Sequence, residues 1–425
     1  MRKSFVLASL CLISVFAMNI CSYAQSTGAP MGSSPIEPSN WSFQCFKSRC
    51  GTDGVWISTI AQPGTVRLWD SGVTWAWLNT SDGAYSWKYL DAWLDVIAEN
   101  QPRAVIYTFG DVPCWIATAA CSGGAENWSP GPPRDLTSSG SAKFSAFVLA
   151  LTQHCSPAGH CVKDYIKYWE LWNEPNRPEH WTGNAKQLYE MVKPIVPIIR
   201  NHVSGAIITT PPICGGDAIW MTSWMELENT NTRLSDYYSI HLYLNQPGQN
   251  NNEPETRMQI IQLMVDTKNA NGWINAPWIN SETNFNVNYT CIFAAEVCAS
   301  QLIRWHILQY AYQGGAGGAF NIGWYDWDSI QLGGYDSYYY TMMKWLVGAG
   351  FTASCTNNGT VWSCPLTEAD GKKALIVWNT AGDSNYKPAA QYVDYRSFNG
   401  TYGGATDHIS KGQTITINTF PMMLE

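Results

Sequence analysis

The sequence contains few charged residues. Only 14% of its 425 residues are Asp, Glu, Lys or Arg, against roughly 25% in an average soluble protein. The charges that are present are mostly acidic, with 33 Asp and Glu against 25 Lys and Arg. This acidic excess argues against nucleic acid and anionic membranes as binding partners.

Long apolar runs are missing beyond the start of the chain. Arg2 and Lys3 precede an apolar run over residues 4–20, and Ser22 and Ala24 are the small residues that a signal peptidase needs. We therefore expect residues 1–24 to be a signal peptide, and the protein to be secreted or periplasmic. No later apolar stretch reaches the ~18 residues of a membrane span, so no membrane contact is expected after cleavage.

Sequence patterns that bind zinc are also missing. There is no HExxH run, and none of the local cysteine pairs has the two-residue spacing of a zinc knuckle. We therefore predict neither a metal nor another cofactor. Eleven of the 13 cysteines follow the signal peptide. In an exported protein their local spacing favours disulfides, the alternative being small buried thiols. Cys214 is left over, and the expected pairs are Cys45–Cys50, Cys114–Cys121, Cys155–Cys161, Cys291–Cys298 and Cys355–Cys364.

Aromatic residues are abundant, with 22 Trp and 22 Tyr, and this excludes a disordered chain. After a tail over residues 25–40, short apolar strands alternate with helical patterns, an order typical of βα units around a parallel sheet. The count of eight strands predicts an α/β fold, a (β/α)8 TIM barrel over residues 41–346. The expected strands are Trp41–Phe46, Thr65–Trp69, Ala104–Phe109, Lys167–Trp172, Ala206–Thr210, Tyr237–Tyr243, Trp278–Glu282 and Ala319–Trp324.

The helices expected between these strands are uneven in clarity. Ser141 is a candidate N-cap for a helix whose buried face is Phe144, Phe147, Val148 and Leu151. Residues 295–312 form another, with Leu302, Ile303, His306 and Tyr310 in one stripe. Residues 184–203 look helical, but Pro194 and Pro197 should interrupt them. Residues 51–63 give the weakest helical pattern.

The pattern changes after Leu346. Four strand-like segments follow, joined by Gly, Asn and Asp turns, with little helical signal. We predict a small C-terminal β-sandwich over residues 347–425. The alternative to a place in the barrel for the Trp41 region is that it adds a strand to this sandwich. The expected strands are Val361–Pro365, Ala374–Trp378, Gln391–Tyr395 and Thr414–Asn418.

Two of the predicted barrel strands end in a carboxylate. The fourth runs into Glu174 and the seventh into Glu282. Because TIM barrels hold their reacting groups at the C-terminal ends of the strands, both carboxylates are expected at one mouth. Two carboxylates that meet there suit the cleavage of a glycosidic bond, in which one is the acid and the other the nucleophile.

The Trp172-Asn173-Glu174-Pro175 stretch resembles the acid/base strand of clan A glycoside hydrolases, which are retaining barrel enzymes. Within that clan the layout is similar to family 39, a group of β-xylosidases, α-L-iduronidases and endoglycosidases. The resemblance implies that Glu174 is the general acid/base, that Asn173 binds the sugar 2-hydroxyl, and that Glu282 is the nucleophile.

The resemblance also implies roles for residues at other strand ends. Arg67 would lie beside the nucleophile, His241 and Tyr243 match a His-x-Tyr arrangement, and Trp324 matches an aromatic platform under the sugar. In family 39 a histidine usually follows the arginine by two residues, and Trp69 stands there in this chain.

Further candidates come from the residues themselves. Trp115, Trp181 and Trp327 lie in loops after predicted strands and are candidate sugar-binding aromatics, and Asp111 is a candidate for binding hydroxyls. Glu170 lies four residues before Glu174, and strand alternation predicts a structural role for it, deeper in the barrel.

The sequence thus predicts a secreted retaining glycoside hydrolase that acts by double displacement on β-type bonds of a carbohydrate substrate. Aromatic residues in several separate loops favour an open cleft and internal cleavage. The alternatives are a transglycosylase that uses the same intermediate, and a carbohydrate-binding barrel without turnover.

Overall fold

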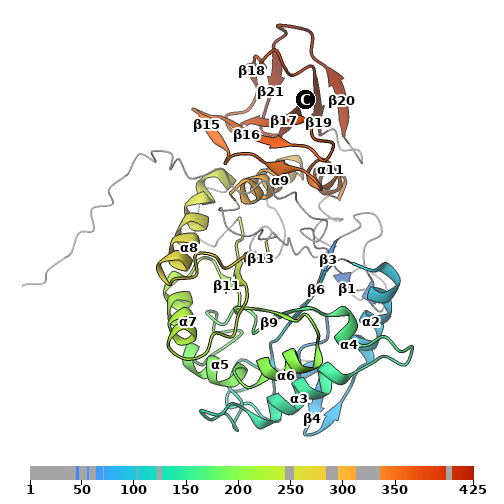
Figure 1. The fold of residues 1–425 in the computed structure, drawn as a ribbon, viewed down its shortest axis with the longest axis vertical. Coiled ribbons are helices and arrows are strands. Elements are labelled where there is room, and N and C mark those ends of the chain that lie inside the picture. Colours follow the sequence, from blue (N-terminus) through green and yellow to red (C-terminus); the bar gives the residue numbers. More distant parts are fainter. Residues whose placement is uncertain are drawn as a thin grey trace, which may run out of the picture.

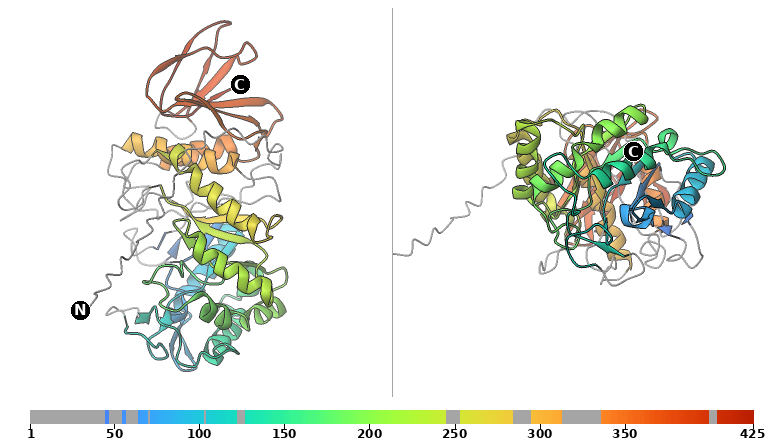
Figure 2. Two further views of the ribbon diagram at one scale, coloured as in Figure 1. Left: turned by 90° about the vertical axis from the view of Figure 1, so that its left-hand side faces the viewer. Right: turned by 90° about the horizontal axis from the view of Figure 1, so that it is seen from below.

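The computed structural model describes residues 45–46, 55–56, 64–69, 71–102, 104–121, 127–244, 253–283, 295–312, 336–398 and 404–425. Six parallel strands form the centre of its larger part, and helices lie outside them (Figure 1). A region of antiparallel strands lies at one end of the molecule (Figure 2). No helix within the described ranges combines the length and the apolar character of a membrane span.

The six parallel strands follow one another in the sheet as they do in the chain. The first four form a sheet in the order β10-β9-β6-β3, and β12 and β13 form a second with the short β11 (Ile213–Cys214). A parallel bridge between Thr209 and Tyr237 joins the two sheets. The strands are β3 (Thr65–Leu68), β6 (Ala104–Thr108), β9 (Tyr168–Glu170), β10 (Ile207–Thr209), β12 (Tyr238–His241) and β13 (Trp278–Glu282).

These six strands confirm predicted barrel strands two to seven. The eighth, Ala319–Trp324, lies outside the described residues. The first predicted strand, Trp41–Phe46, is a strand at its described end, where β1 (Cys45–Phe46) pairs antiparallel with β2 (Val55–Trp56). Its place in the parallel sheet stays a prediction, because residues 41–44 lie outside the described residues. The weak helix expected over residues 51–63 is wrong at β2, where a β-branched and an aromatic residue favour a strand.

The helices follow the expected caps and breaks. The Ser141 side chain accepts a hydrogen bond from the Phe144 amide, and the four predicted apolar residues of that helix are buried. Pro194 separates the helices Ala185–Val192 and Ile195–His202, as expected. Pro197 does not interrupt the second helix, because it lies in the first turn, where a proline ring is tolerated. The helices are α1 (Trp75–Leu78), α2 (Lys88–Asn100), α3 (Ala142–Gln153), α4 (Val162–Tyr165), α5 (Ala185–Val192), α6 (Ile195–His202), α7 (Ala218–Thr230), η2 (Pro254–Arg257), α8 (Met258–Ala270), α9 (Ala295–Ala311) and α11 (Asp336–Leu346).

Antiparallel strands make up the C-terminal region, as predicted. The larger sheet has the order β14-β16-β17-β22-β19-β20, with β15 beside β16, and β18 pairs with β21 separately. Val377 and Leu424 of the larger sheet share a buried cluster with Ile415 and Ile417 of β21. The strands are β14 (Gly350–Phe351), β15 (Thr356–Asn358), β16 (Val361–Thr367), β17 (Lys373–Asn379), β18 (Ser384–Tyr386), β19 (Asp394–Ser397), β20 (Ala405–His408), β21 (Ile415–Ile417) and β22 (Met422–Leu424).

Helices α9 and α11 lie between this region and the parallel strands (Figures 1 and 2). The Trp378 indole donates to Glu255 at 2.7 Å, and the Ser300 hydroxyl donates to the Thr419 carbonyl at 2.5 Å. One buried apolar cluster contains residues of the parallel strands, of these helices and of β17. The two parts therefore share a continuous core.

Four short strands form two separate pairs, β4 (Asn79–Ser81) with β5 (Ala84–Tyr85) and β7 (Val112–Pro113) with β8 (Trp128–Ser129).

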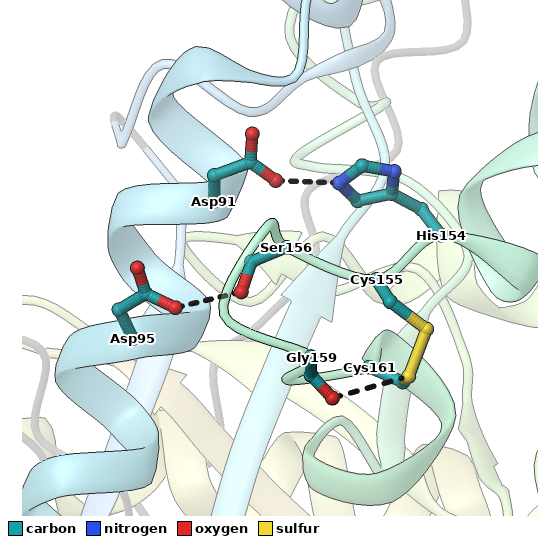
Figure 3. Close-up of a disulfide and its surroundings, with 7 residues drawn as sticks. All are labelled: Asp91, Asp95, His154, Cys155, Ser156, Gly159 and Cys161. Atoms are coloured by element: carbon teal, nitrogen blue, oxygen red, sulfur yellow. Dashed lines mark hydrogen bonds and ion pairs between the residues drawn. A yellow bond between two sulfur atoms is a disulfide. The ribbon is translucent and has the colours of Figure 1, made fainter.

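Three predicted disulfides are confirmed, Cys114–Cys121, Cys155–Cys161 and Cys355–Cys364, and Cys214 is free as expected. Cys298 is also disulfide-bonded, whereas its expected partner Cys291 and the expected partner of Cys45, Cys50, lie outside the described residues. The residues on both sides of Cys155 bind α2: His154 contacts Asp91 at 2.6 Å, and Ser156 donates to Asp95 at 2.7 Å (Figure 3). The disulfide thus closes a loop that is also hydrogen-bonded to α2.

Candidate active site

The C-terminal ends of the parallel strands bring the predicted site residues together. Arg67 lies on β3, His241 ends β12 and Glu282 ends β13, where His241 and Glu282 are direct neighbours across the two strands. Glu174 follows β9 by four residues. All four side chains are buried, so the strand-end rule placed them on the correct edge.

The two carboxylates converge, with His241 beside both of them. Glu174 is 6% exposed and Glu282 is 4% exposed. An oxygen of each and a ring nitrogen of His241 all lie within 4.8 Å of one another. His241 Nδ1 is 2.7 Å from Glu174 Oε1 and 3.7 Å from Glu282 Oε2. Residues 108 positions apart in the chain thus share one small volume.

Arg67 links three of the polar groups through its guanidinium. It donates from Nε to Glu170 Oε2, from Nη1 to Glu282 Oε2 and from Nη2 to Asn173 Oδ1, each at 2.8 Å. Burial lowers the pKa of Arg67, but the surrounding carboxylates outweigh burial, and the net direction is upward. Arg67 is therefore a fixed positive charge beside Glu282, as expected.

Glu282 accepts hydrogen bonds on both oxygens. Arg67 donates to Oε2, and the Tyr243 hydroxyl donates to Oε1. The Tyr243 backbone carbonyl accepts in turn from Arg257 at 3.1 Å, which holds the tyrosine in place. A carboxyl group that accepts a hydrogen bond on each oxygen, one of them from an arginine, suits the ionised form that a nucleophile requires.

Glu174 has a different environment. Burial raises the pKa of this carboxyl group, and the nearby charges of His180 and Arg177 only partly oppose that effect. Its Oε2 atom is 3.6 Å from His180 Nε2 and 3.8 Å from Arg177 Nε. The Glu174 backbone has a φ of 39°, a left-handed conformation that is uncommon outside glycine and clusters at functional sites. A raised pKa suits a general acid.

Several residues around this pair were missed by reasoning from the sequence. Ser239 and Ser281 contact Glu170 and His241, and His180, Arg177 and Cys214 lie around Glu174. Ser239 could have been found, because it shares the alternating face of β12 with His241. Nothing in the spacing of the others indicates the site.

The aromatic candidates lie in different surroundings. Trp181 is 2% exposed and packs edge-on against Trp172 at 5.4 Å, which leaves little of its surface for a sugar. The Trp115 indole donates to the Asn79 carbonyl at 2.9 Å. Asp111 is partly exposed, and its backbone carbonyl accepts from Ala76 at 3.0 Å. Trp324 and Trp327 lie outside the described residues, so the aromatic platform stays a prediction.

Trp69 fills the place where family 39 usually has a histidine. Its ring meets the His180 ring edge-on at 5.7 Å, and it covers Gly110 so closely that a Cβ there would lie 2.3 Å from the Trp69 ring. Trp69 therefore packs between Gly110 and the histidine that neighbours Glu174.

Replacing Gly110 by alanine should lower the free energy of unfolding by about 1–3 kcal/mol, because the added methyl group overlaps the Trp69 ring. Urea denaturation measures this change. A Gly110→Ala/Trp69→Phe double variant should lose less than the two single changes together, since the smaller ring makes room. A Gly110→Ala protein as stable as the parent would contradict this packing.

Glu174, His241 and Glu282 are also the one set of described side chains whose donor atoms lie close enough to share a cation. However, Arg67 already supplies positive charge to Glu282, and His241 Nδ1 already contacts Glu174. The donors are thus engaged within the protein, and the absence of a metal requirement stays a prediction.

A separate hollow of about 700 Å³ lies beside the loop over residues 111–140. Its lining includes Thr118, Pro132 and Arg134 of this loop, and Gln187 and Glu190 of α5. None of the described site residues lines this hollow.

Comparisons with known proteins bear on the family and on the fold. No family model matches the chain. A β-xylosidase of Geobacillus stearothermophilus is 25% identical over 163 residues, a segment that covers 37% of this chain and 31% of that enzyme.

The fold is similar to those of solved glycoside hydrolases. A monomeric β-xylosidase of Caulobacter crescentus CB15 matches with a TM-score of 0.60 and 12% identity, over 93% of this chain and 97% of that one. A GH39 enzyme of Xanthomonas axonopodis pv. citri matches with a TM-score of 0.59 and 13% identity, over 93% and 94%. These findings confirm the resemblance of this chain to clan A glycoside hydrolases of the family 39 type.

Proposed function

We propose that this protein is a retaining glycoside hydrolase with Glu174 as general acid/base and Glu282 as nucleophile. The observation that carries the proposal is the convergence of these two buried carboxylates at the strand ends, in environments that suit opposite protonation states. The similarity to β-xylosidases supports a β-linked carbohydrate substrate.

The separation of the carboxylates favours retention. Retaining enzymes hold the two carboxyl groups about 5–5.5 Å apart, whereas inverting enzymes leave about 6.5–9.5 Å for a water molecule. Here an oxygen of Glu174 and an oxygen of Glu282 lie within 4.8 Å of each other, a spacing on the retaining side of this comparison. Direct attack by Glu282 is thus the mechanism that this spacing supports.

The reaction then has two steps. Glu174 gives its proton to the leaving-group oxygen while Glu282 attacks the anomeric carbon and forms a glycosyl ester. Glu174, now ionised, takes a proton from water, which displaces Glu282 and releases the sugar. Asn173 is held by Arg67, so its amide N–H is oriented for the sugar 2-hydroxyl.

The wider organisation belongs to the same proposal. The six parallel strands and the similarity in fold support closure into a (β/α)8 barrel over residues 41–346, with a β-sandwich over 347–425. Three disulfides fit an exported protein whose first 24 residues are removed. The open cleft and internal cleavage are proposed on the aromatic residues of several separate loops. The hollow beside α5 does not support them, because no residue of the carboxylate site lines it.

Trapping the glycosyl-enzyme tests this function. We expect dinitrophenyl 2-deoxy-2-fluoro glycosides, tried as the xyloside and the glucoside, to label one peptide. The fluorine slows both steps, whereas the good leaving group speeds the first, so the glycosyl-enzyme accumulates. Mass spectrometry of the digested protein should place the sugar on Glu282.

The Glu282→Gln protein is the control for this experiment and should stay unlabelled. Label on another carboxylate would contradict the assignment of the nucleophile. Products longer than the substrate, formed when sugar acceptors are added, would indicate a transglycosylase.

A further inference from the structure

We propose that Glu170, which the reaction itself does not use, acts through Ser239 and Ser281 to fix His241 as its Nε2–H tautomer and so holds the acid proton on Glu174. Glu170 is then a positioning residue for the general acid, rather than only a structural carboxylate. This inference rests on the proposed function in what it says about catalysis, but its hydrogen-bond pattern can be tested without turnover.

The four side chains form a continuous chain of contacts to Glu174. Ser239 Oγ is 2.9 Å from Glu170 Oε1, Ser281 Oγ is 3.2 Å from Ser239 Oγ, and His241 Nε2 is 3.1 Å from Ser281 Oγ. The last contact is His241 Nδ1 to Glu174 Oε1, at 2.7 Å. The first four side chains are fully buried, so water does not compete for these bonds.

A break in the sheet register places Ser281 in this chain. Between β12 and β13, Ile240 pairs with Asn280, but the next residue, His241, pairs with Glu282. Ser281 is therefore the extra residue of a β-bulge, and a bulge re-aims side chains that regular alternation would separate. Both Ser281 and Glu282 consequently reach the same histidine.

The direction of the hydrogen bonds follows from the charge of Glu170. Burial raises the pKa of Glu170, but Arg67 and hydrogen bonds from Ser281 and Thr108 outweigh burial, and the pKa lies below its usual value. An ionised carboxylate only accepts hydrogen bonds, so the Ser239 hydroxyl donates to it.

The remaining protons are then determined one by one. Because Ser239 has used its proton, the proton of Ser281 is used as well, whether it goes to Ser239 Oγ or directly to Glu170. Ser281 Oγ therefore accepts from His241 Nε2–H, and His241 Nδ1 carries no proton. The 2.7 Å contact between Nδ1 and Glu174 Oε1 then requires a proton that comes from Glu174.

A doubly protonated His241 beside an ionised Glu174 would satisfy the same contacts. Burial opposes it, and although Glu282 favours the charged ring, the pKa of His241 falls to about 4. Seven other titratable or charged groups surround Glu174 and His241. They are Arg67 on β3, Glu170 on β9, Arg177 and His180 in the loop after β9, Cys214 on β11, Tyr243 just after β12, and Glu282 on β13.

The arrangement explains how two adjacent carboxylates hold different protonation states. Arg67 keeps both Glu282 and Glu170 ionised. The ionised Glu170 orients the two serine hydroxyls, which leaves His241 Nδ1 without a proton and able to accept the proton of Glu174. After Glu174 has given this proton to the leaving group, its carboxylate faces the Nδ1 lone pair. That repulsion favours recovery of the proton from the attacking water.

Nitrogen NMR of the full-length protein labelled with ¹⁵N-histidine tests the proposal directly. At neutral pH we expect His241, assigned by loss of its signals in His241→Gln, to have a protonated Nε2 and an unprotonated Nδ1. Ser281→Ala and Ser239→Ala should shift this tautomer balance. A protonated Nδ1 in the parent, alone or in an imidazolium, would overturn the proposal.

Kinetics separate this role from a merely structural one. Ser281→Ala should lower kcat/KM about 10–100-fold for aryl glycosides with poor leaving groups, which need the acid, and much less for dinitrophenyl glycosides. Equal losses on both substrates, or none, would overturn the positioning role. A parent without activity on any glycoside would refute the proposed function, whereas the NMR result would still stand.

Ser235→Ala is the matched control for both measurements. Ser235 is also buried and donates to a buried glutamate, Glu228, at 2.7 Å, but the pair lies at α7. This variant should change neither the His241 tautomer nor the dependence on the leaving group. A change of either in Ser235→Ala equal to that in Ser281→Ala would show a general effect of losing a buried serine.

Discussion

Replacing Glu282 by glutamine should lower kcat/KM about 10⁴-fold or more, the loss expected when an enzyme that forms a covalent intermediate loses its nucleophile. The amide has nearly the shape of the carboxylate but attacks the anomeric carbon poorly. The fold should survive, because Arg67 keeps its bonds to Glu170 and Asn173 and the amide oxygen can still accept from Tyr243. Hydrolysis of aryl glycosides, followed beside thermal unfolding, measures both effects.

Glu228→Gln is the matched control for Glu282→Gln. Glu228 is a buried carboxylate that accepts from the Trp224 indole at 2.8 Å and from Ser235. Losing its charge should reduce stability without affecting the chemistry. If Glu282→Gln cleaved glycosides at the parent's rate, the nucleophile would be assigned to the wrong residue.

Replacing Glu174 by alanine should lower kcat/KM about 10²–10⁴-fold for substrates whose leaving group needs a proton. Dinitrophenyl glycosides should still form the intermediate, because their leaving group departs as an anion. Hydrolysis of that intermediate should then be slow, since the variant has no base to activate water. A burst of dinitrophenolate followed by slow turnover is the kinetic signature to measure.

Azide and pH supply independent checks on Glu174. Azide needs no base, so it should restore turnover of Glu174→Ala and give a glycosyl azide of the substrate's configuration. In the parent, kcat/KM should fall as pH rises through the elevated pKa of Glu174, because the acid then loses its proton. The variant should lack this alkaline decline. A variant that azide does not rescue and that keeps the decline would assign the acid elsewhere.

Much of the fold follows from local patterns in the sequence. Apolar strands of regular spacing predicted six parallel strands within a few residues of their observed bounds, and Ser141 and Pro194 marked helix ends correctly. Such signals are local, because capping and the proline ring act within one helical turn. The antiparallel pairing of β1 with β2 was not predicted, because the pattern within a strand does not give its partner.

The sequence alone also determined which polar residues lie together at one edge of the parallel strands. The ends of parallel strands share one edge, so a carboxylate that ends a strand, such as Glu282, or follows one, such as Glu174, could be placed there with Arg67 and His241. The short cysteine spacing, together with the expectation of export, predicted the three disulfides that the structure contains.

Only the tertiary structure decided how those residues contact one another. Arg67 and Glu282 are 215 residues apart in the chain, and no local pattern records that they pair. The bulge at Ser281 interrupts the alternation of side chains between the two faces of β13, because one extra residue turns a side chain to the other face. A prediction based on that alternation therefore fails at this point. Sequence periodicity gives the edge on which a side chain lies, whereas its hydrogen-bond partners depend on the register between strands, which only the folded chain sets.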